Sequence, residues 1–153
     1  MSTTNLGRRL AWHGVLLFFL ALVEGIFVYS MRNPRMGLTT HVGGITTALF
    51  FLAIAALWRE LRLSDRAAAA AWWMTVGGGY GSVASLLLAA LLGTSRATPI
   101  AGAGFSAPPW QETLVTAALT ITGVPLFVAS LLLLWGFRAS ASAATGSDPR
   151  HER

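Results

Sequence analysis

The sequence predicts an all-α protein: an integral membrane four-helix bundle with both termini in the cytoplasm. Two features of the sequence support this fold class. Hydrophobic residues make up 54% of the 153 residues and charged residues only 11%, whereas a soluble domain carries about 25% charged residues. The apolar residues fall into four long runs, and the arginines lie at the ends of these runs, where membrane proteins carry them.

Four apolar runs provide the predicted membrane spans. They cover residues 10–31, 38–58, 67–92 and 113–137. Each run has at least about 20 residues, and at about 1.5 Å per residue such a helix crosses a hydrocarbon core about 30 Å thick. We expect one transmembrane domain over residues 1–138. Residues 139–153 are rich in alanine, serine and glycine and then polar, so we expect a disordered cytoplasmic tail.

The arginine distribution predicts the orientation of the helices and argues against a nucleic-acid partner. Eight arginines lie in the N-terminal segment, the second loop or the C-terminal tail, and three lie in the first and third loops. Because cytoplasmic segments carry the excess of arginine, both termini are predicted to be cytoplasmic. The expected location of the protein is a bacterial inner membrane. The net charge of +5 suits nucleic acid, but arginines scattered over the span ends do not form a binding stripe.

Polar residues inside the apolar runs are the candidates for function, because such residues are costly in a membrane and face a bundle interior or a cavity. Glu24 either forms a hydrogen bond to another helix in its protonated form, or handles a proton or orients a substrate. His13, about one turn into the first run, is either an interfacial histidine bonded to a carbonyl or a site residue. Tyr80 either completes a core hydrogen bond or offers its hydroxyl in a dry cavity. The absence of cysteine excludes thiolate catalysis and iron–sulfur ligation.

His41 is the candidate for a metal ligand. Gly44 follows three residues later, on roughly the same face of a helix, so a flat group such as haem can approach the backbone beside the imidazole, a standard axial ligand. The alternative is that Gly44 serves close helix packing, as Gly77 and Gly81 are also expected to do.

The longest connection between two runs covers residues 94–111 and contains three prolines and two glycines. Loops of this length are often lids or binding loops. Arg35 and Glu112 are predicted to lie at the outer mouth beside this loop, either as solvated charges or as binding residues.

Two stretches of the sequence resemble the signature of the hydroxylaminobenzene mutase family. The first is Asn-Pro-Arg-Met-Gly-Leu-Thr-Thr-His at residues 33–41, followed by Gly44. The second is Pro-Ile-Ala-Gly-Ala-Gly at residues 99–104, followed by Gln111 and Glu112. Trp-His-Gly at 12–14 and Trp-Gly at 135–136 fit as well, so the resemblance spans about residues 8–138. His41 and the early His-Gly pair are also similar to styrene oxide isomerase, a distant relative with the same four-helix plan.

The resemblance implies an isomerase that rearranges an N-arylhydroxylamine, a small apolar aromatic molecule, to an aminophenol. The similarity to styrene oxide isomerase implies a homotrimer that holds haem b between subunits, with His41 on an iron that acts as a Lewis acid. In that picture Gly44 lets the haem approach, Tyr80, Thr47 and Arg35 bind the substrate, and Glu24 holds or relays a proton. Membrane lipid is the other expected partner.

The sequence departs from the mutase pattern near His41. Gly43 stands where the family has an acidic residue, and Thr47 stands where it has an asparagine. Serines such as Ser82 and Ser85 replace an asparagine of the third helix. These departures leave two alternatives open: a non-catalytic haem-binding or haem-sensing membrane protein, and a structural helper subunit without a cofactor.

The predicted orientation is testable with a fusion protein. A reporter that is active only outside the cytoplasm, fused after Arg153, is expected to stay inactive, because the eight-to-three arginine distribution keeps the C-terminus inside. The same reporter inserted in the loop at residues 94–111 is expected to be active. Strong activity of the C-terminal fusion would contradict the orientation.

Overall fold

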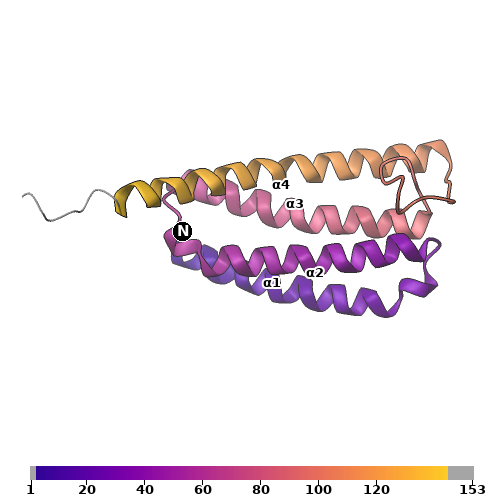
Figure 1. The fold of residues 1–153 in the computed structure, drawn as a ribbon, viewed down its shortest axis with the longest axis horizontal. Helices are drawn as coiled ribbons and strands as arrows, with labels where there is room; N and C mark the ends of the chain where they lie inside the picture. Colours follow the sequence, from indigo (N-terminus) through magenta and orange to yellow (C-terminus); the bar gives the residue numbers. More distant parts are fainter. Residues whose placement is uncertain (1–2, 145–153) are drawn as a thin grey trace, which may run out of the picture.

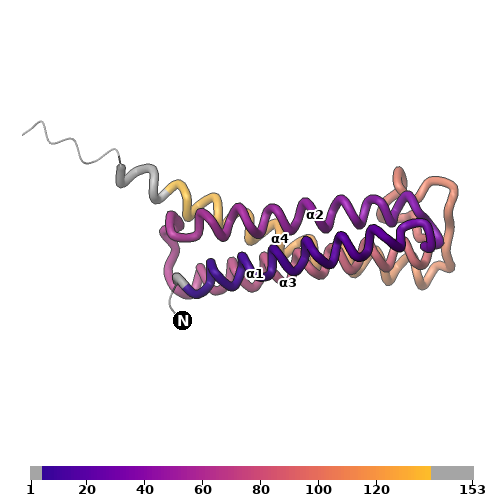
Figure 2. Tube along the Cα trace, turned by 90° about the horizontal axis from the view of Figure 1, so that it is seen from below, coloured from indigo at the N-terminus to yellow at the C-terminus, as the bar shows by residue number. Residues whose placement is uncertain are grey.

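In a computed structural model the chain forms four helices that run up and down, with both termini at one end (Figure 1). The structure describes the backbone of residues 3–144 and the side chains of residues 5–138. The elements are α1 (Thr3–Ile26), η1 (Val28–Ser30), α2 (Pro34–Ala56), η2 (Trp58–Glu60), α3 (Asp65–Leu92) and α4 (Pro109–Ala144). We call the end that carries both termini and η2 the terminal end, and the end that carries η1 and residues 93–108 the loop end (Figure 2).

The predicted all-helical fold is confirmed. All four helices are long and apolar enough to cross a membrane, over Asn5–Ile26, Pro34–Ala56, Asp65–Leu92 and Pro109–Arg138. Helix α4 continues to Ala144, so the first part of the predicted disordered tail is helical. The remainder of that tail, residues 145–153, lies outside the described residues.

The start of α1 differs from the sequence prediction. The helix begins at Thr3, seven residues before the apolar run that was expected to define it. His13 therefore lies about three turns into α1, and the prediction that it lies one turn from the inner end is wrong. The physical reason is that the residues before Leu10 include polar and charged ones but no proline, so nothing prevents the helix from continuing through them.

Local signals set the ends of α2 and α3. Asn33 caps α2, because its side-chain oxygen accepts a hydrogen bond from the Met36 N–H at 3.1 Å, and Pro34 occupies the first turn. Ser64 caps α3 in the same way. Gly93 ends α3 in the left-handed conformation, with φ 66°, which glycine adopts without strain.

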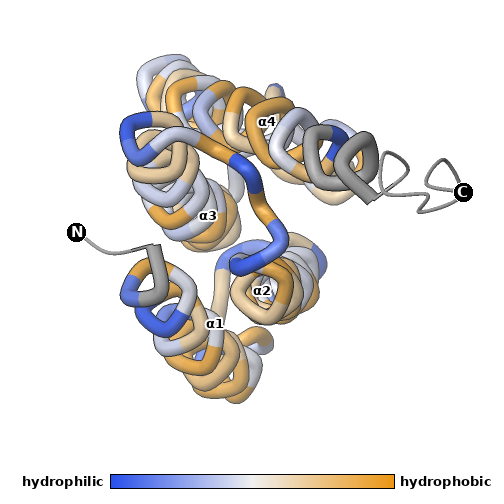
Figure 3. Tube along the Cα trace, turned by 90° about the vertical axis from the view of Figure 1, so that its left-hand side faces the viewer, coloured by the Kyte–Doolittle hydropathy of each residue, from blue (hydrophilic) through white to orange (hydrophobic). Residues whose placement is uncertain are grey.

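The helices pack as two hairpins that meet through α2 and α3. Helix α1 pairs with α2, α3 pairs with α4, and α4 contacts the rest of the bundle mainly through α3 (Figure 3). One apolar cluster, around Leu10, Phe51 and Trp72, fills the terminal half of the bundle. A smaller one, around Met36 and Val115, fills the loop end.

Glycines allow close contact between the helices. A Cβ on Gly44 would lie 2.9 Å from Ala21 Cβ on α1, and one on Gly81 would clash with Thr122 on α4. By contrast, a Cβ on Gly77 would meet nothing within 4 Å. Within one chain Gly77 therefore faces open space, and Gly78, which faces the Thr122 carbonyl, is the partner of Gly81 at the α3–α4 contact.

Three side chains around the start of α2 fasten the long loop. The Arg32 guanidinium donates to the carbonyls of Leu92, at 3.0 Å, and Ser106, at 3.2 Å. The buried Asn33 amide donates to the Ala101 carbonyl at 3.0 Å, and Arg35 donates to the Ala103 carbonyl. We call Arg32, Asn33 and Arg35 the clamp.

Glu112 fastens the other side of the same loop. Its buried carboxylate accepts hydrogen bonds from the backbone N–H groups of Ser95, at 3.0 Å, and Arg96, at 2.9 Å. The loop is therefore held both by the clamp and by the first turn of α4. Neither contact was foreseen from the sequence, which treated Arg35 and Glu112 as solvated charges or binding residues.

The clamp predicts the effect of Asn33→Ala. The variant loses the cap of α2 and the hydrogen bond to Ala101, and it leaves that partly buried carbonyl without its donor. We expect it to be less stable to unfolding by about 2 kcal/mol and to be cleaved faster in the loop by added protease. The measurements are the thermal unfolding midpoint in detergent and the rate of limited proteolysis.

Thr39→Ala is the matched control for Asn33→Ala. The Thr39 hydroxyl only donates to the Arg35 carbonyl one turn back, and the residue is exposed. We expect its stability and its proteolysis rate to stay near those of the unmodified chain. Equal proteolysis of the loop in both variants would refute the anchoring role of Asn33.

Candidate functional site

Two grooves at the loop-end half of the bundle contain most of the predicted site residues. The first, of about 470 Å³, lies between α1 and α3 and includes Glu24, Tyr80 and Thr40 in an otherwise apolar lining. We call it the Glu24 groove. The second, of about 520 Å³, lies against another face of α1 and is lined by Arg35 and His41 among other residues. We call it the His41 groove.

Glu24 is the polar group with free hydrogen-bonding capacity in its groove. Both carboxylate oxygens are buried and have no hydrogen-bond partner among the described residues. The Thr40 hydroxyl donates to the Met36 carbonyl and the Tyr80 hydroxyl donates to the His13 carbonyl. Since an unpaired buried carboxyl group is costly, the Glu24 groove favours a ligand with an N–H or O–H group that can donate to it.

His41 forms a hydrogen bond across the contact between α1 and α2. Its Nδ1 lies 2.8 Å from the carbonyl oxygen of Ala21. A carbonyl can only accept, so Nδ1 carries the proton and a neutral ring keeps its lone pair on Nε2. Gly25 makes room for the ring, because a Cβ there would lie 2.5 Å from Nδ1. This is the arrangement in which histidine ligates a metal through Nε2.

His41 and Glu24 lie close to each other at the boundary of the two grooves. The His41 Nδ1 is 3.8 Å from a Glu24 carboxylate oxygen, and their side chains are 24% and 12% exposed. A change of charge on either group therefore acts on the other. The sequence placed these two residues in one polar cluster, and the structure brings them together.

Tyr80 contacts His13, although His13 was expected near the opposite end. The Tyr80 hydroxyl donates to the His13 carbonyl at 3.2 Å and lies 3.4 Å from His13 Nδ1. The His13 ring also meets the rings of Trp12 and Trp72 edge to face. His13 thus holds Tyr80 at one end of the Glu24 groove. The absence of a helix-breaking residue before Leu10 was the signal that could have placed His13 at this depth.

Thr47 and Gly44 line neither groove. The Thr47 hydroxyl donates to the Gly43 carbonyl of its own helix at 2.8 Å, and its methyl group faces Gly79 on α3. Gly44 lies against Ala21 of α1. The structure therefore gives both residues a packing role within one chain, which is the alternative that the sequence left open for Gly44.

The donors around His41 suit a cofactor that brings its own ligands. Among the described residues no three histidine, aspartate or glutamate side chains gather in a way that could hold a bare metal ion. One imidazole with a free Nε2 is the contribution that a protein makes to a haem iron, whose remaining equatorial ligands come from the porphyrin. Arg35 lines the same groove, and a guanidinium pairs well with carboxylates such as those that haem carries.

Comparison with known proteins places the chain among isomerases. The family model of styrene oxide isomerase matches residues 6–138. The chain is 38% identical over 144 residues to hydroxylaminobenzene mutase HabB of Ectopseudomonas oleovorans. The aligned region covers 94% of this chain and 87% of that protein. It is also 35% identical over 124 residues to hydroxylaminobenzene mutase HabA of the same organism. That aligned region covers 80% of this chain and 92% of HabA. These matches confirm the resemblance on residues 8–138, and the chain belongs to the styrene oxide isomerase family, a family of isomerases.

Proposed function

We propose that this chain is an integral membrane isomerase that rearranges an N-arylhydroxylamine to an aminophenol, with haem b as its cofactor. The observation that carries the proposed reaction is the 38% identity to a hydroxylaminobenzene mutase over 94% of the chain. The proposed haem depends on the similarity to styrene oxide isomerase and on the free Nε2 of His41. No redox partner is required, since oxygen moves from nitrogen to a ring carbon, that carbon loses a proton and the nitrogen gains one.

A location in the membrane suits this reaction. The four helices carry exposed apolar side chains on their outer faces, among them Phe19, Ile121, Phe127 and Leu134, and a bilayer covers such surfaces. A small aromatic substrate dissolves in lipid and can enter the grooves from the side. Cleavage of the N–O bond develops positive charge on the ring that water would trap, so a dry groove favours the rearranged product.

His41 would hold the haem through Nε2, with Arg35 near the cofactor's carboxylates. When bound, the iron supplies a Lewis acid that polarises the substrate's oxygen. The hydrogen bond from Nδ1 to the Ala21 carbonyl keeps the imidazole in the required tautomer and orientation. Gly44 has no part in this proposal, because Ala21 already occupies the space beside it.

The Glu24 groove would bind the substrate. Its apolar lining takes the aromatic ring, and the Glu24 carboxyl group accepts a hydrogen bond from the substrate's N–H or O–H and then holds the proton that the ring carbon releases. The Tyr80 hydroxyl, held by His13, lies at the other end of the groove and orients the ring. Thr47 supports the groove only indirectly, through its contact with Gly79.

A homotrimer would unite the two grooves. They lie on different faces of α1, so one chain alone does not turn its Glu24 groove toward its own His41 groove. If one copy's His41 groove packs against the next copy's Glu24 groove, each haem has a substrate beside it. The exposed apolar residues around both grooves, such as Phe27 at 56% and Leu38 at 54% exposure, support such a contact.

One observation favours a second candidate, a non-catalytic haem-binding or haem-sensing membrane protein. The hydroxyl of Thr47, which stands where the mutase pattern has an asparagine, is used within its own helix, and Gly43 offers no side chain. The polar side chains that the mutase pattern places at positions 43 and 47 are therefore not available to a ligand, whereas His41 of that pattern is present. Turnover of phenylhydroxylamine separates the two candidates, since a sensor binds haem but forms no aminophenol.

His41→Ala tests the cofactor. The detergent-purified protein is expected to show a Soret band, and His41→Ala is expected to lose most of it, because no other described residue offers an unhindered imidazole in that groove. Imidazole added to His41→Ala is expected to restore part of the band by occupying the ring-sized space. The measurement is the visible absorption spectrum.

His13→Ala is the matched control for His41→Ala. It removes the other histidine of the bundle but leaves the His41 groove intact, so we expect a largely unchanged Soret band and a lower rate of turnover, because Tyr80 loses its support. A full band in His41→Ala together with a lost band in His13→Ala would show that the haem lies beside His13.

Oligomeric state gives an independent test. We expect a trimer in mild detergent, the number of subunits that the similarity to styrene oxide isomerase implies. Native mass spectrometry is the measurement, and a spectrum with monomers only would contradict both the trimer and the shared site.

A further inference from the structure

A third groove lies at the terminal end, far from the two grooves of the proposed site. It has a volume of about 570 Å³ and lies between the first turns of α1 and the end of α2 with η2. We call it the terminal groove. Arg8 on α1 and Arg59 in η2 both line it. Arg8 lies 16 residues before Glu24 on the same helix, which corresponds to about 24 Å, so the terminal groove is separate from the Glu24 groove.

The two arginines of the terminal groove have no partner among the described side chains. Among the described residues, neither Arg8 nor Arg59 forms a salt bridge or a hydrogen bond with another side chain. The three arginines at the loop end differ in this respect. Arg32 and Arg35 bind carbonyls of the long loop, and Arg96 is in contact with Thr113.

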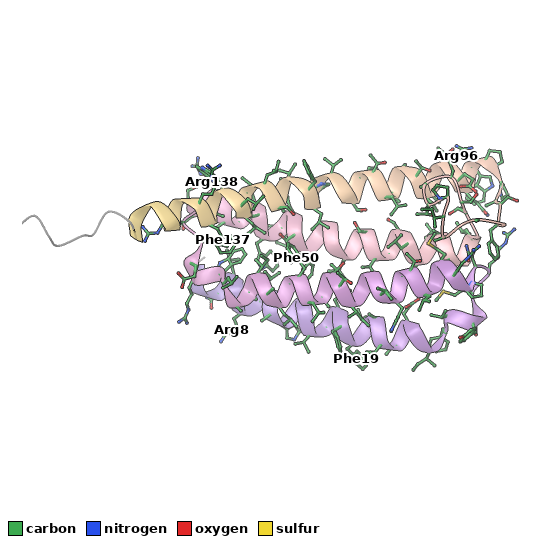
Figure 4. All side chains as sticks on the ribbon, viewed as in Figure 1. Arg8, Phe19, Phe50, Arg96, Phe137 and Arg138 are labelled. Atoms are coloured by element: carbon green, nitrogen blue, oxygen red, sulfur yellow. The ribbon has the colours of Figure 1, made fainter. Side chains whose placement is uncertain are left out.

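The remainder of the terminal groove is apolar. Its lining includes Ala11 of α1, and Leu52 and Ala55 of α2. Gly7 lies against the buried Trp58 at one side of the groove, and a Cβ on Gly7 would come 2.9 Å from the Trp58 Cβ. The groove therefore joins two positive charges at the end of the bundle to an apolar crease that runs along the helices. Figure 4 shows Arg8 at this end, near the point where η2 turns back.

We propose that the terminal groove binds an anionic phospholipid, with the phosphate between Arg8 and Arg59 and an acyl chain along Ala11, Leu52 and Ala55. A guanidinium group presents two parallel N–H donors that match two phosphate oxygens. Paired arginines where a helix leaves the bilayer are at the depth of lipid phosphates. A free phosphate would use the charges but leave the apolar crease uncovered, so the combination favours a lipid.

The test compares two variants that lose the same charge. Arg8→Gln with Arg59→Gln removes both arginines of the terminal groove. Arg66→Gln with Arg138→Gln removes two exposed arginines of the same end that do not line the groove. Each purified protein is titrated in detergent with phosphatidylglycerol, phosphatidylcholine or inorganic phosphate, and native mass spectrometry counts the bound molecules.

We expect one phosphatidylglycerol to bind the unmodified chain more tightly than phosphatidylcholine. The groove variant is expected to bind it roughly 30-fold more weakly, about fivefold for each arginine, and the control variant within about twofold of the unmodified chain. Equal weakening in both variants would show attraction by net charge alone and overturn the proposal. Equal binding of phosphatidylglycerol and phosphatidylcholine would also overturn the proposal. If inorganic phosphate saturates the groove and displaces the lipid, the terminal groove is a site for small anions and the lipid proposal is overturned. The Soret band and turnover of the groove variant are independent of this result, because Arg8 and Arg59 take no part in the proposed reaction.

Discussion

The hydrogen bond between the His41 imidazole and the Ala21 carbonyl ties the proposed haem ligand to the packing of the first two helices. It requires α1 and α2 to approach closely, and the sequence permits this by placing Gly25 beside the ring and Gly44 beside Ala21. The same contact brings Glu24 to 3.8 Å from the ring. A larger residue at Gly25 would displace the imidazole ring. The displacement would redirect the lone pair of Nε2, change the distance to Glu24 and reshape the boundary between the two grooves.

The second constraint acts at the loop end, where two stretches far apart in the sequence meet. The clamp residues Asn33 and Arg35 bind carbonyls of Ala101 and Ala103, so the two stretches that carry the family resemblance are partners in the fold. This gives the two stretches a structural role that is independent of Gly43 and Thr47. The clamp fixes the loop and the start of α2, whereas positions 43 and 47 face other helices.

The sequence predicts the helices well because length and hydropathy decide whether a segment can cross a bilayer. It places the start of α2 at residue 38, four residues late, because an apolar run does not record the Asn33 cap and Pro34 that begin the helix. It predicts the site less well. The depth of His13 depends on where α1 begins, and an apolar run does not record a helix that continues through Arg8 and Arg9. Whether the Thr47 hydroxyl reaches a groove depends on the rotation of α2 against α3. The identity of Thr47 does not determine that rotation.

The arrangement of the bundle as two hairpins has a consequence for how the chain is made. Residues 3–56 and residues 65–144 form separate helix pairs, so each pair can form its own helix–helix contact without the other. The bonds from Asn33 and Arg35 then have no acceptor until the second pair is in place, because Ala101 and Ala103 lie between α3 and α4. These bonds therefore form only when both hairpins are in place, and they link the assembly of one hairpin to that of the other.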